Sequence, residues 1–174
     1  MKLVIIAAVS TDGVIGIGKD IPWRIPEDFK HFRETTMGNM LLVGATTFQT
    51  LPPKAHEGRE FIILNSGERF PLTGVPYYQF SDFDTVMSLL NHENVSLDKV
   101  FVIGGSSIYH LLIDHCDEAI ITWVNTSFDD LTNAFMFPVE KLKSDFMDMN
   151  YMDWQKSKTG MEYKIIKYKR KSGS

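Results

Sequence analysis

Asp28 is the residue of this sequence best placed to do chemistry on a flat heterocycle. It stands one residue before Phe29 and four before Phe32, so in a helix its carboxylate lies on or beside the apolar face. A carboxylate in an apolar pocket binds paired N–H donors, and desolvation raises its pKa. The alternative is that Glu27 and Asp28 only complement the positive end of the helix dipole. The residues around Asp28 favour the first interpretation.

The segment upstream of Asp28 is a candidate for a loop that closes over a ligand. Residues 12–18 contain three glycines within six positions, which allows backbone conformations that other residues resist. Pro22 and Trp23 follow this loop and precede Asp28. The alternative is an ordinary flexible connection. The glycine spacing by itself does not match the dinucleotide-binding fingerprint.

Two glycine-led turns are candidates for binding a phosphate group. Glycine lets the backbone approach a ligand closely, and free N–H groups at a helix start attract an anion. The residues concerned are Gly44, Ala45, Thr46 and Thr47 in one turn and Gly104, Gly105, Ser106 and Ser107 in the other. We predict that the two helix starts face each other and clamp one pyrophosphate. The alternative for each is a tight strand-to-helix turn with side-chain caps.

Metal-ion and serine-nucleophile chemistry have little support in this sequence. The five histidines are scattered and lack acidic partners at the spacing of a helical metal site, so we expect no metal centre. No glycine-serine-glycine nucleophile elbow occurs. Hydride transfer needs neither, since a cofactor carries the reactivity while the protein positions the reactants and excludes water.

Short apolar runs alternating with helical patterns would position these residues. The runs cover residues 3–9, 40–43, 61–64, 100–103 and 119–124, and the helical patterns cover 27–36, 81 or 82 to 90, and 107–113. Strands that alternate with helices indicate βαβ crossovers and a mostly parallel sheet. At the C-terminus, residues 154–157 and 163–168 flank the polar turn 158–160, which predicts an antiparallel hairpin.

The composition indicates one domain with a small-molecule partner. The 174 residues, 44% of them hydrophobic, suffice for one core, so we expect a single domain at 1–170 and a disordered tail or expression remnant at 171–174. A net charge of -4 provides no broad electrostatic footprint for nucleic acid. The basic cluster within residues 164–171 is interpreted as a solvated edge strand with a charged tail, the alternative being a polyanion contact.

The cysteine content and the N-terminus predict a cytoplasmic protein. Cys116 is the single cysteine, which excludes an intramolecular disulfide and fits a reducing compartment. The apolar run at residues 3–9 is too short for a signal-peptide core, and no segment approaches the length of a membrane span. We therefore expect no membrane partner.

Taken in order, these motifs resemble the dihydrofolate reductase family along nearly the whole chain. The matching segments are residues 6–8, 14–16, 21–23, 26–28, 35–38, 43–44, 46–48, 58–59, 102–105, 108–109 and 121–122. The resemblance implies an α/β fold with a mixed, mostly parallel eight-stranded sheet, four flanking helices and an antiparallel C-terminal strand. It also implies a monomeric NADPH-dependent oxidoreductase that converts 7,8-dihydrofolate to tetrahydrofolate for one-carbon metabolism and that binds antifolate inhibitors.

The resemblance further implies roles for individual residues. Asp28 would bind the pterin with support from Thr122, and Trp23 would hold a water near the ring; these are the three predicted catalytic residues. Hydride would pass to C6, and a water admitted by the loop 13–21 would protonate N5. Arg59 would form a bidentate fork with the α-carboxylate of the substrate.

The same resemblance implies two sets of binding residues. The predicted substrate-binding residues are Ile6, Ala7, Ile21, Asp28, Phe29, Phe32, Leu51, Arg59, Ile103, Tyr109 and Thr122. The predicted cofactor-binding residues are Ala8, Ile15, Gly16, Gly44, Ala45, Thr46, Thr47, Asn65, Ser66, Ile103, Gly104, Gly105, Ser106, Ser107, Ile108 and Tyr109.

One departure from the family pattern concerns the cofactor. Ala45 stands where family members often have a basic residue that holds the 2′-phosphate of NADPH, so use of NADH is an alternative. Ser66 and Arg69 could supply the missing contact. Ala45 is also the only sequence support for a non-catalytic binding protein of this fold. A related pyrimidine reductase of riboflavin synthesis would not be expected to combine Trp23, Asp28 and Arg59.

Two further departures concern the loop and the substrate tail. Ala134 replaces an acidic residue that steadies the mobile loop in the family, and Asp129, Asp130 or Asn133 could substitute for it. Residues 52–57 differ in composition and length from the usual segment, which bears on affinity for polyglutamate tails and antifolates.

Overall fold

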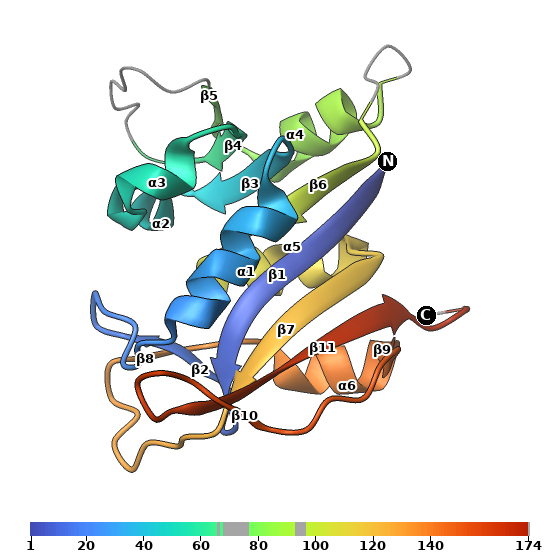
Figure 1. Ribbon diagram of the computed structural model, residues 1–174. Helices are drawn as coiled ribbons and strands as arrows, with labels where there is room; N and C mark the ends of the chain where they lie inside the picture. Colours follow the sequence, from blue (N-terminus) through green and yellow to red (C-terminus); the bar gives the residue numbers. More distant parts are fainter. Residues whose placement is uncertain (66, 68–76, 93–96, 174) are drawn as a thin grey trace.

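The protein is built on one large mixed β-sheet (Figure 1). The structure is a computed structural model that describes residues 1–65, 67, 77–92 and 97–173. The sheet contains β1 (Lys2–Ser10), β3 (Met40–Gly44), β4 (Glu60–Leu64), β5 (Tyr77–Phe80), β6 (Lys99–Val102), β7 (Glu118–Val124), β9 (Phe146–Asp148), β10 (Gln155–Lys156) and β11 (Glu162–Arg170). A separate two-stranded sheet pairs β2 (Val14–Ile17) with β8 (Ala134–Met136).

The strand order confirms the predicted mixed, mostly parallel sheet. Eight strands follow the order β10-β11-β7-β1-β6-β3-β4-β5, and β9 pairs with β11 beside this row. All pairs from β7 to β5 are parallel, whereas β11 runs antiparallel to β7, β9 and β10. The predicted C-terminal hairpin is therefore also confirmed, with its turn between β10 and β11.

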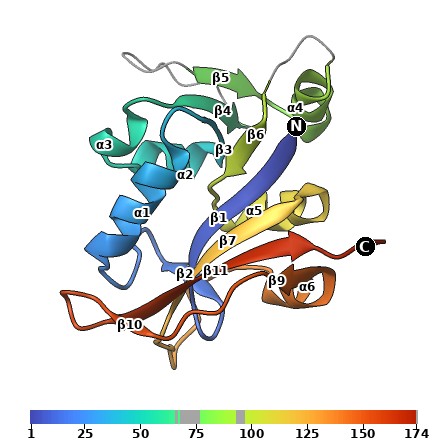
Figure 2. The same cartoon turned by 45° about the vertical axis from the view of Figure 1, so that its right-hand side comes forward.

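Helices cover both faces of this sheet (Figure 2). The helical elements are α1 (Pro26–Thr36), α2 (Ala45–Thr50), α3 (Pro53–His56), α4 (Phe83–Leu90), α5 (Ser106–Leu112), the 3-10 helix η1 (Ile113–His115) and α6 (Val139–Asp145). The described residues thus form six α-helices, against the four expected. The two that no pattern predicted are α3 and α6. α3 has only four residues, and α6 carries only two apolar side chains, Val139 and Leu142, so neither shows a clear 3.6-residue apolar period in the sequence.

The two faces of the sheet carry separate apolar clusters. Alternate residues of β1 divide between them: Leu3, Ile5 and Val9 pack with α4, α5 and α6, whereas Val4 and Ile6 pack on the opposite face toward α2. Successive side chains of a strand point to opposite faces, so a strand covered on both sides is apolar at every position. This explains the continuous apolar run at residues 3–9.

The helix starts follow the local signals in the sequence. α1 begins at Pro26, and its first turn carries the acids Glu27 and Asp28. α4 begins after Asp82, whose Oδ1 accepts a hydrogen bond from the backbone N–H of Thr85 at 2.8 Å. The predicted starts of both helices are confirmed.

The interpretation of the C-terminal basic cluster as an edge strand is wrong. β11 lies between β7 on one side and β9 and β10 on the other. Two of the five cations have aromatic partners: Lys164 lies over the Trp154 ring and the guanidinium of Arg170 over the Phe146 ring, each at 4.6 Å, while Lys167, Lys169 and Lys171 are exposed. The chain returns after α6 and covers β11 with two short strands, which local periodicity could not reveal. In the described part of the chain, no helix is long and apolar enough to cross a membrane.

We expect Leu42→Ala in β3 to lower the free energy of unfolding by about 2–5 kcal/mol, because the Leu42 side chain is 1% exposed and the variant leaves a cavity. Denaturant titration followed by circular dichroism measures this change. Leu89→Ala in α4 is the matched control, since Leu89 is 40% exposed and the cost should be about 1 kcal/mol or less. Equal losses in the two variants would show that the sheet centre is not the tightly packed core.

Candidate active site

Asp28 and Thr122 meet at the centre of the site, although 94 positions separate them in sequence. Asp28 lies in the first turn of α1, and Thr122 lies in β7 directly beside Ala8 of β1. The Thr122 hydroxyl donates to Asp28 Oδ1 at 2.5 Å, and the Thr122 residue is 2% exposed. The structure therefore brings together the predicted carboxylate and its predicted supporting hydroxyl.

The surroundings of Asp28 favour its protonated form more than water does. Desolvation by burial is the largest influence and raises the pKa of Asp28, while the hydrogen bond from Thr122 and the nearby His31 oppose it. Burial in turn lowers the pKa of His31, with Asp28 acting in the opposite direction. Asp28 is thus a half-buried carboxyl group whose Oδ1 is held by one neutral hydroxyl.

An apolar surface adjoins this carboxyl group. Ile6, Phe32, Leu51 and Ile103 belong to the same apolar cluster on the α1 side of the sheet, and Phe29 lies 6.4 Å from Phe32 between ring centroids. Ala7 and Tyr109 belong to the cluster on the other face. Ile21 is 64% exposed, so its side chain stands in the loop before α1 and not in the packed interior. Trp23 packs near Phe128, with ring centroids 6.4 Å apart.

The two glycine-led turns lie against each other at the carboxyl ends of β3 and β6. The backbone N–H of Gly44 donates to the carbonyl of Gly104 at 2.8 Å. A Cβ atom on Gly105 would lie 2.9 Å from Thr47 Oγ1, and one on Gly44 would lie 3.0 Å from Ile108 Cγ1. Both turns therefore need glycine for their close approach, and the predicted proximity of the two helix starts is confirmed.

Gly44 and Gly105 are the N-cap residues of α2 and α5, and glycine has no side chain to cap the helix. Some hydroxyl groups of these turns bond to the protein, and others are exposed. Ser106 donates to the carbonyl of Met136 at 2.6 Å, whereas Thr46 and Ser107 are exposed. Side chains that could reach a ligand are thus present next to uncapped helix starts.

Tyr109 has a structural contact that sequence inspection did not reveal. Its hydroxyl donates to the carbonyl of Ile6 at 2.8 Å, which ties α5 to β1, and burial raises the pKa of this phenol. A Cβ atom on Gly104 would lie 3.0 Å from the Tyr109 ring, so the ring also packs against the turn. Tyr109 holds the turn at Gly104 close to the strand that carries Ala8.

Arg59, which is predicted to form a bidentate fork with the substrate carboxylate, donates most of its N–H groups to the protein itself. It is 3% exposed, and its guanidinium donates to Thr36 Oγ1 at 2.8 Å and to the carbonyls of Arg33, Lys54 and Glu57. Of its five N–H groups, four are therefore engaged within the described residues. These contacts have a simple physical reason, since a buried guanidinium must satisfy its donors with nearby acceptors.

Arg33 is a functional candidate that sequence inspection missed. Its guanidinium lies over the Phe29 ring at 5.2 Å, and its Nε is buried without a hydrogen-bond partner among the described residues. Burial lowers the pKa of Arg59 most, and the charge of Arg33 lowers it further, so the two cations are close. The signal was available, because Arg33 stands four residues after Phe29 on the same helix.

The loop after β1 is held by backbone contacts. β2 pairs with β8, and the N–H of Gly18 donates to the carbonyl of Asn133 at 2.9 Å. Asp130 instead accepts from Thr132. Of the proposed substitutes for the acid missing at Ala134, Asn133 contacts the loop, and it does so through its main chain. The predicted contacts of Ser66 and Arg69 lie outside the described residues.

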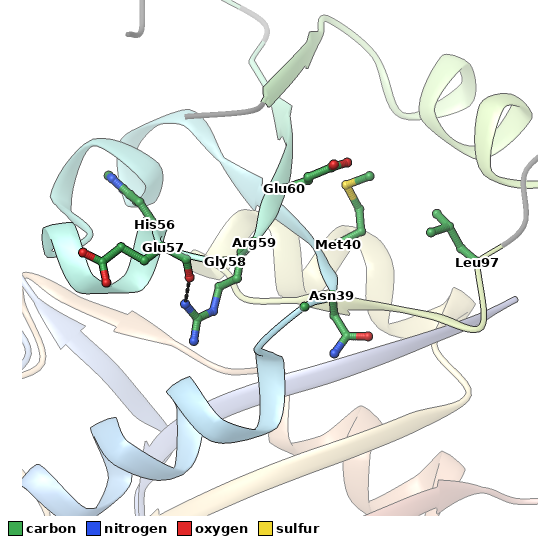
Figure 3. A pocket seen from close by; sticks show the side chains of 9 residues that line it. Asn39, Met40, His56, Glu57, Gly58, Arg59, Glu60 and Leu97 are labelled. Carbon is green, nitrogen blue, oxygen red and sulfur yellow. Dashed lines mark hydrogen bonds between the residues drawn. The ribbon is translucent and has the colours of Figure 1, made fainter. Parts of the chain in front are cut away.

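A cavity of about 490 Å³ shares Arg59 with the predicted site residues but none of the others (Figure 3). It is lined by Gly38, Asn39, Met40, His56, Glu57, Gly58, Arg59, Glu60 and Leu97. Met40 and Glu60 are the first residues of β3 and β4, so this cavity is at the amino ends of the strands. Ligands of open parallel sheets bind at the carboxyl ends, where Gly44 and Gly104 lie. The cavity is therefore not the region of Asp28 and the two glycine-led turns, although Arg59 borders it.

We expect Asp28→Asn to become more stable relative to wild type as the pH rises. Because burial raises the folded-state pKa of Asp28 above its usual 3.8, ionisation destabilises the fold progressively above that pH, and asparagine removes this term. Unfolding titrations between pH 3 and 7 measure the difference. Asp82→Asn is the control with the opposite sign, since hydrogen bonds from Thr85 lower the pKa of Asp82. A pH-independent difference for Asp28→Asn would show that its carboxyl is not desolvated.

Comparison with known proteins agrees with this geometry. The dihydrofolate reductase family model matches residues 2–170. The chain is 31% identical over 172 residues to the dihydrofolate reductase of Mycobacterium tuberculosis, covering 95% of this chain and 96% of that one. It is 34% identical over 155 residues to the type 9 dihydrofolate reductase of Escherichia coli, covering 83% of each chain. The chain therefore belongs to the dihydrofolate reductase family.

Proposed function

We propose that this protein transfers hydride from NADPH to 7,8-dihydrofolate and releases 5,6,7,8-tetrahydrofolate. The observation that carries the proposal is the hydrogen bond between Thr122 and the desolvated carboxyl group of Asp28, next to an apolar surface. A pterin needs both features, because its ring is flat and apolar on its faces while its amino and ring N–H groups lie on one edge. The names of the similar proteins support the same reaction.

In this proposal Asp28 binds the edge of the pterin that carries the amino group. Its two oxygens can accept two parallel N–H bonds, and Thr122 fixes the orientation of the carboxylate by donating to Oδ1. Ile6, Phe32 and Ile103 provide the apolar contact for the ring faces. A charged hydrogen bond in a desolvated site is stronger than the same bond in water, so the two bonds from the pterin to Asp28 give both affinity and orientation.

The residues present fit a dinucleotide cofactor. The turns at Gly44 and Gly104 meet at the carboxyl ends of β3 and β6, their helix starts lack side-chain caps, and Thr46 and Ser107 expose hydroxyl groups beside them. These turns would hold the phosphates, while Ala8, Ile15 and Gly16 would hold the nicotinamide end. When bound, NADPH supplies the hydride. The contribution of the chain is to place the two rings in near-attack geometry and to exclude water.

Asp28 acts on the reaction without delivering the proton to N5 directly. It lies at the edge of the pterin site formed with Thr122, and its raised pKa makes it a weaker acid than a surface aspartate. By holding the amino edge of the ring it influences the basicity of the ring nitrogens. The immediate proton donor in this proposal is a water admitted by the loop 13–21, which β8 holds through backbone hydrogen bonds.

The tail of the substrate would meet two arginines. Arg59 keeps one N–H group beyond its contacts with the protein, and the guanidinium of Arg33 stands near it over the Phe29 ring. We propose that a carboxylate of the glutamate tail binds between these two cations. This arrangement replaces the fork from Arg59 alone.

The remaining proposals concern localisation, oligomeric state, partners and inhibitors. We propose that the protein works as a cytoplasmic monomer without nucleic-acid or membrane partners and that antifolates occupy the pterin site. The single cysteine, Cys116, is buried and has its pKa raised by that burial to about 12, so it is present as an unreactive thiol.

Cofactor oxidation at 340 nm with purified protein and dihydrofolate tests the reaction. We expect rapid oxidation that depends on dihydrofolate, and we expect Asp28→Asn to reduce kcat/KM for dihydrofolate by about 100-fold while cofactor binding is kept. The variant keeps the shape of the side chain and the acceptor for Thr122. If the wild-type protein oxidises neither NADPH nor NADH in the presence of dihydrofolate, the proposed reaction is contradicted.

Ala45→Arg tests the cofactor preference in the same assay. A guanidinium at this position should pair with the 2′-phosphate of NADPH and lower its KM by about tenfold, as expected for one charged hydrogen bond, while KM for NADH stays unchanged. Ala45→Gln is the control of similar length without charge. An equal effect on both cofactors would show that position 45 does not face the phosphate.

A further inference from the structure

The turn between β10 and β11 is attached to the start of α1. Glu27, the residue before Asp28, accepts a hydrogen bond at Oε1 from the Ser157 hydroxyl at 2.9 Å and at Oε2 from the backbone N–H of Lys158 at 3.1 Å. The Thr159 hydroxyl donates to the carbonyl of Arg24 at 2.5 Å. Figures 1 and 2 both show this hairpin end beside the first turn of α1. One turn of chain therefore contacts both the segment after Trp23 and the first turn of the helix.

The turn is itself well fixed. Ser157 is buried, its N–H donates to the carbonyl of Met161, and its carbonyl accepts from the N–H of Gly160. Gly160 has a φ of +90°, which favours glycine and closes the turn. Behind the turn, β11 pairs with β7 so that Ile165 lies opposite Thr122. The turn and the partner of Asp28 thus belong to two adjacent strands of the same sheet.

The start of α1 needs such an attachment. Its N-cap residue, Ile25, has no side-chain oxygen and forms no side-chain cap. Desolvation raises the pKa of Glu27, but hydrogen bonds from its own backbone, from Ser157 and from Lys158 outweigh this and lower the pKa overall. The carboxylate therefore stays ionised near neutral pH and keeps both acceptor oxygens.

We propose that Glu27 is a positioning residue whose carboxylate, through Ser157 and Lys158, holds the first turn of α1 so that Asp28 stays against Thr122. The β10–β11 turn then acts as the clamp that sets the pterin-binding geometry. Glu27 does not contact the reacting atoms in this proposal. The inference rests on the proposed function for its kinetic consequences, but its structural part is independent of activity.

Amide hydrogen exchange tests the clamp without reference to catalysis. In the wild-type protein the N–H groups of Asp28 and Phe29 donate to the carbonyl of Ile25. In Glu27→Ala and in Ser157→Ala these two groups should exchange at least about tenfold faster than in wild type. Glu34→Ala is the matched control, because it removes an exposed acid from the same helix, one that pairs with Lys30 at 3.9 Å and not with the β10–β11 turn. Unchanged exchange in both clamp variants would overturn the proposal.

Steady-state kinetics test the consequence for the site. Glu27→Ala should raise KM for dihydrofolate by about tenfold, with kcat changed less than about threefold and KM for NADPH unchanged. Glu27→Gln keeps the acceptor for Ser157 and loses the one for Lys158, so its KM should lie between those of wild type and Glu27→Ala. Equal KM changes for both substrates would indicate general loosening of the fold and would contradict the proposal.

A double-mutant cycle with Thr122→Val separates positioning from mere stability. If Glu27 acts by holding Asp28 against Thr122, Glu27→Ala should raise KM for dihydrofolate much less in the Thr122→Val background than in wild type. The same increase in both backgrounds would overturn the proposal. Faster exchange at Asp28 in a protein that shows no dihydrofolate-dependent oxidation would keep the clamp and reject the proposed reaction.

Discussion

The bond between Thr122 and Asp28 is the constraint on which the remainder of the structure depends. A carboxyl group withdrawn from water is costly unless a donor faces it, and the neutral hydroxyl of Thr122 is the side chain that donates to it. The bond requires α1 to begin opposite the middle of β7, which in turn fixes the path of the loop from β1 and the position of Trp23. Within the described residues Asp28 accepts one hydrogen bond, at Oδ1, so its Oδ2 is available for a ligand.

The sheet provides the rest of the constraint. Because β1 is covered on both faces, it can lie in the row between β7 and β6 and bring Ala8 beside Thr122. The parallel direction of β3 and β6 places Gly44 and Gly104 at the same edge, where one backbone hydrogen bond joins them. The proposed substrate and cofactor sides of the site are therefore consequences of one topology.

Charge placement follows burial more closely than local sequence. Arg59 was assigned to the substrate by resemblance, yet its burial commits most of its donors to backbone carbonyls, and Arg33 occupies the more open position beside Phe29. The basic residues of β11 were assigned to a solvated edge, yet Arg170 lies over Phe146 because short strands cover β11. In both cases the partner comes from a distant segment, so the pattern of neighbouring residues carries no information about it.

The sequence by itself determined the central strands, the start of α1 at Pro26 and the identity of Asp28 as the unusual acid, because apolar period and helix-start chemistry are local properties. The pairing of Thr122 with Asp28 was implied by the family resemblance and not by any local pattern. Only the tertiary structure decided that Tyr109 is tied to Ile6 and that Glu27 is held by a turn 130 positions away. These are contacts between elements, and their geometry depends on strand order and register, which residue types along the chain do not encode locally.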